Sequence, residues 1–232
     1  MALGTVAALH RYPVKAMAGE PLEHAEVSWF GVPGDRRYAF VQSDHRGDFP
    51  WLTIRELPEL TRYRPAFSRD PEREAPLITT PAGRTLEIGD PELAAELAEK
   101  SRRRVHLHHD RRGTFDAFPV SVISLQTVAA VGELVGREFD PRRFRQTLVI
   151  AAPAGAFAEE ALLGRSIRAG EARLRLSVRD ERCMVVNFDP DSAERDPQVL
   201  RAVARHRDAC LGVYSTVEAP GAIRVGDPVQ AA

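Results

Sequence analysis

Ala172-Arg173-Leu174-Arg175-Leu176-Ser177-Val178 alternates apolar and polar side chains, and Arg182-Cys183-Met184-Val185-Val186-Asn187-Phe188-Asp189-Pro190-Asp191 follows a few residues later. Such alternation is typical of a strand with one buried face. The spacing therefore places Cys183 just beyond the end of a strand and beside Arg182. A neighbouring guanidinium favours the thiolate, the form of cysteine that binds metals or attacks electrophiles. The simpler alternative, a small buried apolar residue, stays open at this point.

The chain has 232 residues, enough for one large domain or two small ones, and its 44% hydrophobic content can supply a buried core. Its 17 prolines and 16 glycines favour many short strands over long helices. The formal net charge of −1 gives no indication of binding to nucleic acid or to an anionic membrane. No apolar run approaches the roughly 18 residues of a membrane span, and the first residues lack a signal-peptide pattern. We therefore expect a cytoplasmic protein.

Cys183 and Cys210 are the only cysteines, and the chain has no CxxC pattern. So sparse a count is unlike a secreted disulfide scaffold, and the missing pattern excludes a zinc ribbon and a thioredoxin motif. We expect Cys210 to pack in the core. The alternating His106 and His108 could ligate a metal from one strand face, but only Asp110 reinforces them, so a solvated strand face is favoured.

Short segments of strand character separated by turn residues predict a curved sheet or a barrel. Helices are expected after Asp90 and Asp196, each of which precedes a proline, and after Ser124, because these residues can cap free backbone amides. The expected strands include residues 5–9, 22–29, 36–41, 52–54, 77–79, 84–88, 118–123, 148–151, 172–178, 213–217 and 223–229.

The chain lacks the nucleotide-binding patterns GxxxxGK[ST] and GxGxxG and the hydrolase patterns HExxH and GxSxG. Glu159 and Glu160 are adjacent, so on a helix they point in different directions and make no shared acid–base site. What remains is one candidate thiolate and several cations beside expected strand ends. A soft sulfur ligand combined with anion-binding cations suits a phosphate-bearing cofactor with a soft metal. The cations are Lys15, Arg36, Arg37, Arg143 and Arg145.

Four segments, in this order and spacing, resemble the MOSC family, which is named for the C-terminal domain of molybdenum cofactor sulfurase, together with its N-terminal β-barrel region. The resemblance spans essentially the whole chain and is greatest for the amidoxime-reducing members of the family. The four segments are Tyr12-Pro13-Val14-Lys15, Gly34-Asp35-Arg36-Arg37-Tyr38, Arg182-Cys183 with Asp189-Pro190-Asp191, and Pro220-Gly221-Ala222-Ile223-Arg224-Val225-Gly226-Asp227-Pro228-Val229.

The resemblance implies a β-rich α+β fold, in which a MOSC-type β-barrel with peripheral helices is joined to an N-terminal β-barrel-like subdomain. On this division residues 1–112 form the N-terminal region and residues 113–232 form the MOSC domain, with the two halves intertwined. A molybdopterin cofactor is also implied, with its molybdenum bound by Cys183 as metal ligand and catalytic centre. Asp189 is a candidate proton carrier, although an aspartate that forms a turn is the simpler interpretation.

The resemblance further implies which residues bind the cofactor. Lys15 and Arg36 match the positions that hold its phosphate, and Arg145 matches a further arginine. Ala16 stands where a small hydroxyl residue is usual, and Thr147 stands where an asparagine is usual. Each change removes or alters a neutral hydrogen bond, worth about 1 kcal/mol. We expect one pocket at a junction of the two halves to be bounded by Lys15, Arg36, Arg145 and Cys183.

The implied activity is the reduction of N-hydroxylated compounds such as amidoximes, hydroxylamines and N-oxides. Because no iron–sulfur domain follows the last segment, electrons are expected from a separate ferredoxin- or flavoprotein-type partner. Two alternatives stay open: a non-catalytic carrier of the cofactor, and a relative that has lost the cofactor.

Overall fold

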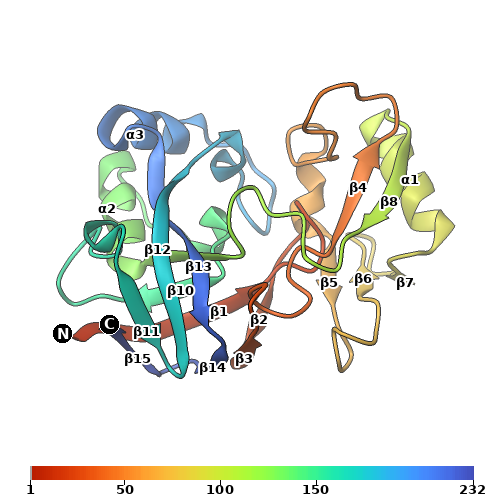
Figure 1. Cartoon of the computed structure of the whole chain (residues 1–232). Coiled ribbons are helices and arrows are strands. Elements are labelled where there is room, and N and C mark those ends of the chain that lie inside the picture. Colours follow the sequence, from red (N-terminus) through yellow and green to blue (C-terminus); the bar gives the residue numbers. More distant parts are fainter. Residues whose placement is uncertain (1) are drawn as a thin grey trace.

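The computed structural model describes residues 2–232 of the chain, and Met1 lies outside the described part. Figure 1 shows two lobes, a β-barrel with helices on the left and a smaller lobe on the right, which contains short strands and the helix α1 (Pro91–Ser101). Both ends of the described chain lie at the barrel, where Ala2 is paired with Gln230. The barrel lobe therefore combines the first and the last strands of the sequence.

Seven strands close the barrel. They are hydrogen-bonded in the order β10-β9-β13-β12-β11-β15-β1, and β1 pairs back onto β10. Closure leaves no free sheet edge around the ring, which is how barrels avoid edge-to-edge association. The predicted β-rich fold with a barrel and peripheral helices is confirmed. The strands are β1 (Ala2–Arg11), β9 (Val120–Ser124), β10 (Leu148–Ala151), β11 (Ser166–Ala169), β12 (Ala172–Glu181), β13 (Cys210–Ala219) and β15 (Pro228–Ala231).

Strand β12 follows the alternation seen in its sequence. Ala172, Leu174 and Leu176 are fully buried in the barrel, and the arginines between them are exposed. The β12–β13 ladder then shifts register between Leu176 and Val178, as a β-bulge does, and Val178 is 41% exposed. The bulge thus leaves Val178 outside the barrel core, whereas Asp180 two residues later is buried again.

The smaller lobe has a separate core, built from short antiparallel strands and one helix. β4 pairs with β8, and β5, β6 and β7 form a second small sheet. Two further strands, β3 and β14, pair beside the barrel, and β2 extends the barrel sheet next to β1. The bounds are β2 (Glu20–Leu22), β3 (His24–Val27), β4 (Tyr38–Gln42), β5 (Arg64–Ala66), β6 (Leu77–Thr79), β7 (Thr85–Glu87), β8 (Val105–His109) and β14 (Gly221–Arg224).

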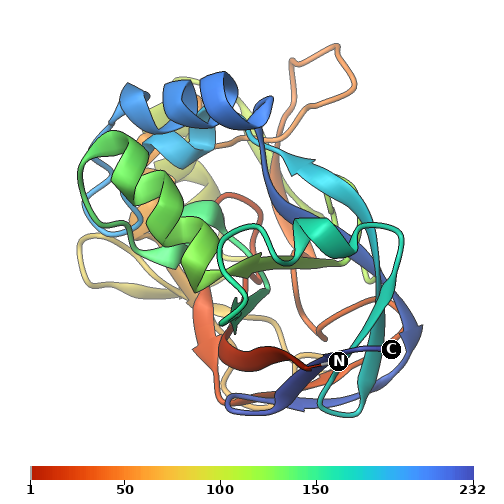
Figure 2. The same ribbon diagram turned by 90° about the vertical axis from the view of Figure 1, so that its left-hand side faces the viewer.

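All three expected helices begin where their caps predict. The side chains of Asp90, Ser124 and Asp196 accept a hydrogen bond from the first turn of α1 (Pro91–Ser101), α2 (Leu125–Val135) and α3 (Pro197–Arg207). Figure 2 shows α2 and α3 together on the outside of the barrel. In Figure 1, α1 lies on the outer side of the smaller lobe, beside β8. No helix within residues 2–232 is both long and apolar enough to cross a membrane.

We expect His10 to make the stability of the barrel sensitive to acid. It lies in β1, is 7% exposed, and its Nδ1 has no hydrogen-bond partner within residues 2–232. Burial lowers the pKa of His10, and Arg142 lowers it further, whereas Asp140 acts in the opposite direction. The unfolded chain therefore takes up a proton near pH 6.5, and the folded chain does so only at lower pH. Stability should fall as the pH drops below this value, by at most about 1.4 kcal/mol per pH unit from this group.

The variant His10→Gln tests this expectation, because glutamine does not titrate. Urea denaturation of both proteins at about pH 7.5 and about pH 5.5 gives the change in unfolding free energy on acidification. The wild type should lose more stability than the variant over this range. Equal losses would show that His10 contributes nothing to the acid sensitivity.

Candidate functional site

A cavity of about 500 Å³ lies between the two lobes. The smaller lobe contributes residues 53–55 and Phe49, and the end of β12 contributes residues 178–183. Lys15, Arg36, Arg145 and Cys183 all line it, as the sequence led us to expect. We call it the main cavity.

Cys183 follows β12 directly and precedes the short helix η4 (Met184–Asn187). Its thiol is free and the residue is partly exposed, so it is not sealed in the core. Arg182 donates hydrogen bonds to the carboxylate of Asp180, which is 2% exposed, and to the carbonyl of Phe144. The charge of Arg182 is therefore largely neutralised by Asp180. The sequence suggested that Arg182 acts on the neighbouring thiol of Cys183, but the guanidinium of Arg182 is already paired with Asp180.

Lys15 reaches the cavity from the segment after β1. The residue is only 8% exposed, and its Nζ donates to the carbonyl of Thr114 at 2.7 Å and to Oδ1 of Asp116 at 2.8 Å. Burial lowers the pKa of Lys15, while its pairing with Asp116 opposes that shift. The ammonium group is thus fixed in position, with Asp116 as its anionic partner.

Arg36 is held by a buried carboxylate. Its Nη1 donates to Oδ2 of Asp35 at 2.6 Å and its Nη2 donates to the carbonyl of Arg145 at 2.8 Å. Oδ1 of Asp35 accepts from the backbone amide of Tyr12 at 2.7 Å, and Asp35 is 1% exposed. Our sequence interpretation missed this role of Asp35, although the residue lies within the Gly34–Tyr38 segment that carries the resemblance. The position of Asp35 directly before Arg36 was the one sequence feature that could have indicated this pairing.

Arg145 is the cation of the site without a counter-ion. Its guanidinium stacks on the ring of Tyr12 at 4.5 Å and forms no ion pair or side-chain hydrogen bond with residues 2–232. Burial lowers its pKa to about 10, so it stays charged at neutral pH. A partly buried guanidinium without an acceptor is costly, and an anionic ligand would remove that cost. The donor set therefore fits a group that carries phosphate.

Three residues of this site have left-handed backbone conformations that only glycine adopts readily. The φ angles are 70° at Ala16, 50° at Arg36 and 56° at Arg145. Each such conformation costs on the order of 1–2 kcal/mol, and strain of this kind gathers at ligand-binding sites. Ala16 itself lines the main cavity, so the bend at this residue sets the direction of the chain beside Lys15.

The structure does not bring Asp189 or Thr147 to the main cavity. Oδ1 of Asp189 accepts the backbone amides of Asp191 and Ser192, and Oδ2 accepts from Arg143 at 3.0 Å. Burial raises the pKa of Asp189, but these donors outweigh it and hold the pKa below its usual value. A carboxylate so engaged forms a turn, and we assign it no proton-carrier role. Thr147 is 1% exposed, and its amide donates to Oγ of Ser121 at 3.1 Å.

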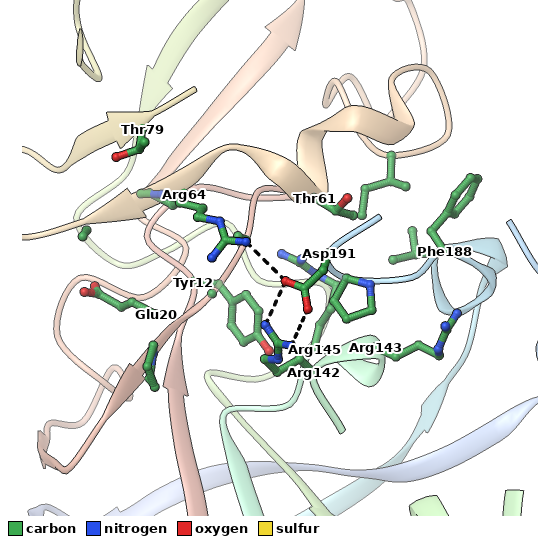
Figure 3. A pocket seen from close by; sticks show the side chains of 18 residues that line it. Tyr12, Glu20, Thr61, Arg64, Thr79, Arg142, Arg143, Arg145, Phe188 and Asp191 are labelled. Atoms are coloured by element: carbon green, nitrogen blue, oxygen red, sulfur yellow. Dashed lines mark hydrogen bonds and ion pairs between the residues drawn. The ribbon is translucent and has the colours of Figure 1, made fainter. Parts of the chain in front are cut away.

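A second cavity of about 240 Å³ adjoins the first and shares Arg145 with it. Figure 3 shows Asp191 at its centre, where the carboxylate accepts from Arg142 at 2.6 Å and from Arg64 at 3.4 Å. Arg64 belongs to β5 in the smaller lobe, so Asp191 links the two lobes across this cavity. The hydroxyl group of Tyr12 also lies here and has no partner within residues 2–232.

The remaining sequence candidates lie elsewhere. The ring of His108 packs against Trp51, with 5.4 Å between the ring centroids, and Nδ1 of His106 is hydrogen-bonded to Oγ of Ser43 at 2.9 Å. No group of three or more histidine, cysteine, aspartate or glutamate residues within residues 2–232 is arranged to hold a metal. Cys210, which we expected in the core, is only partly buried and lines neither cavity.

Two of the similar proteins match nearly the whole chain. The mouse (Mus musculus) protein "Mitochondrial amidoxime-reducing component 1" is 24% identical over 291 residues, spanning 98% of this chain and 82% of the mouse protein. The crystal structure of the YUAD protein from Bacillus subtilis matches with a TM-score of 0.53 and 16% identity, over 98% of this chain and 94% of that one. YiiM from Geobacillus stearothermophilus matches 49% of this chain and 54% of its own, with 20% identity and a TM-score of 0.40.

Two family profiles match in sequence order. The MOSC N-terminal beta barrel domain matches residues 3–119, and the MOSC domain matches residues 102–230. The two matches overlap at the segment that leads from β8 back into the barrel. These two matches establish that the chain belongs to the MOSC family.

Proposed function

We propose that this protein binds a molybdenum cofactor and reduces N-hydroxylated compounds such as amidoximes, hydroxylamines and N-oxides. Membership of the MOSC family supports a function related to the molybdenum cofactor, and the mouse relative is named for amidoxime reduction. The observation that carries the proposal is local. One cavity holds a free thiol and a guanidinium that has no side-chain partner within residues 2–232, the two groups that a soft metal with a phosphate-bearing organic ligand needs.

Four residues of the main cavity have defined tasks in this proposal. The sulfur of Cys183 is the ligand for the metal, because thiolates bind soft metals well. The cations of Lys15, Arg36 and Arg145 hold the phosphate, and Arg145 gains the acceptor that it lacks. When bound, the cofactor supplies the two electrons that cleave an N–O bond. The protein itself orients the cofactor and the substrate between the two lobes.

Electrons come from outside the chain in this proposal. The most suitable donor is a separate ferredoxin- or flavoprotein-type protein that docks over the main cavity. Two protons are also needed to release the oxygen as water. Because Asp189 is engaged in its turn, we propose that these protons enter from solvent at the open mouth of the cavity.

The decisive experiment uses protein produced in a host that makes the cofactor. Benzamidoxime is supplied with a chemical electron donor, and formation of benzamidine is measured. Multiple turnovers per molybdenum support the reductase. Protein that contains molybdenum but does not turn over would instead be a carrier of the cofactor, and protein without molybdenum would contradict both functions.

A further inference from the structure

We propose that Asp116 is a displaceable internal ligand of the anion site, which is formed by the cations of Lys15, Arg36 and Arg145. Its carboxylate pairs with the ammonium group of Lys15 until a phosphate group replaces it. Asp116 would thereby select phosphate dianions over anions of lower charge. This inference rests on the proposed function, because it concerns the same cations.

The two partners of this ion pair differ in how firmly they are held. Lys15 has a side chain that is 8% exposed and donates to both Thr114 and Asp116. The side chain of Asp116 is 57% exposed, and within residues 2–232 the Lys15 ammonium is its only hydrogen-bond partner. Rotation of Asp116 into solvent therefore breaks one interaction and leaves the ammonium in place.

The backbone around Asp116 permits such a movement. Thr114 is anchored, because its amide and its hydroxyl both donate to the carbonyl of Arg36, at 2.8 and 2.9 Å. Residues 115–119 follow without regular secondary structure and without a backbone hydrogen bond to residues 2–232, until β9 begins at Val120. Thr114 thus fixes one end of the segment while Asp116 stays outside any ladder.

The charges around Asp116 explain why a strong anion is required. Burial raises the pKa of Asp116, but Lys15, Arg36 and Arg145 outweigh it, so the carboxylate is ionised at neutral pH. The other cavity carboxylates are Glu181 at the end of β12 and Asp180, which is paired with Arg182. An internal carboxylate competes at an effective concentration in the millimolar range or above. A phosphate carries about −1.5 to −2 charges and three strong acceptor oxygens, and so it can prevail where a monoanion does not.

Asp116→Asn tests the proposal, because it keeps the shape and removes the charge. Inorganic phosphate is titrated into the full-length chain, prepared without cofactor, by isothermal titration calorimetry. We expect the variant to bind phosphate about tenfold more tightly than the wild type, as loss of one competing, partly exposed charge predicts. Asp70→Asn is the matched control, since Asp70 is a similarly exposed carboxylate that is paired with Arg73 and lines neither cavity. The phosphate affinity of this control should stay within about twofold of the wild-type value.

Two further measurements test whether competition for the Lys15 ammonium causes the change in phosphate affinity. In a Lys15→Met background, Asp116→Asn should increase phosphate affinity much less, because the competition is mainly for that ammonium and only the weaker effect on Arg36 and Arg145 remains. Acetate should bind the wild type more weakly than phosphate does. The ratio of the two affinities should be smaller in Asp116→Asn than in the wild type. Equal phosphate affinity in the wild type and Asp116→Asn, or an increase of undiminished size in the Lys15→Met background, would overturn the proposal. None of these measurements needs molybdenum, so a failed reductase assay leaves the test intact.

Discussion

Replacement of Cys183 by serine is expected to remove molybdenum from the protein. The thiol is free and partly exposed, and it lies in the wall of the main cavity beside three cations. A serine hydroxyl has nearly the same size, but it is a hard and weakly acidic ligand that does not replace a thiolate on a soft metal. In a host that makes the cofactor, metal content should fall from near one atom per chain by about tenfold or more, which corresponds to at least about 1.4 kcal/mol of binding free energy.

Cys210→Ser is the matched control for this experiment. It removes the only other thiol, and that thiol lines neither cavity. Elemental analysis of purified wild type and both variants should find molybdenum in the wild type and in Cys210→Ser only. Metal that persists in Cys183→Ser would show that another residue binds it. Circular dichroism of the three proteins distinguishes loss of the ligand from loss of the fold.

Replacement of Asp35 by alanine is expected to have the largest effect on stability. Asp35 is 1% exposed, and its two oxygens accept from Tyr12 and from Arg36. Removing one partner of a buried ion pair leaves the other charge without compensation, which costs about 3–5 kcal/mol. For a chain of this size that loss should lower the melting temperature by about 10 °C.

Urea denaturation of Asp35→Ala, Asp35→Asn and Asp48→Ala measures this effect. Asparagine keeps an acceptor for the amide of Tyr12 but not the charge. Asp35→Asn should therefore lose less unfolding free energy than Asp35→Ala. Asp48 lies in an exposed loop, and its replacement should change the unfolding free energy by less than about 0.5 kcal/mol. If Asp35→Ala is as stable as Asp48→Ala, the ion pair does not hold the site together.

Local features of the sequence predicted the elements that surround the site. The alternation from Ala172 to Leu176 predicted strand β12, and the capping residues Asp90 and Ser124 predicted where helices begin. Such features are readable because a strand or a cap depends on residues a few positions apart. The same reasoning placed Val178 in the strand pattern but could not foresee the bulge that exposes it, since a bulge depends on the partner strand.

The composition of the site was only partly predictable. Lys15, Arg36, Arg145 and Cys183 were selected mainly through the resemblance to the MOSC family, and the structure places all four in the wall of one cavity. Their roles in binding a cofactor stay predictions. Sequence reasoning missed the carboxylates that control these cations, because a charged residue in a loop looks like any other solvated residue until its partner is known.

By itself, the sequence determined a β-rich chain with capped helices and a cysteine just beyond the end of a strand. Only the tertiary structure decided which cations are already paired: Asp35 neutralises Arg36, Asp116 engages Lys15, and Arg145 has no counter-ion within residues 2–232. Lys15 and Asp116 are 101 positions apart, and the carbonyl of Arg145 meets Arg36 across 109 positions. Contacts over such separations follow from closure of the barrel and from the return of the chain between the lobes, which no local pattern of residues encodes.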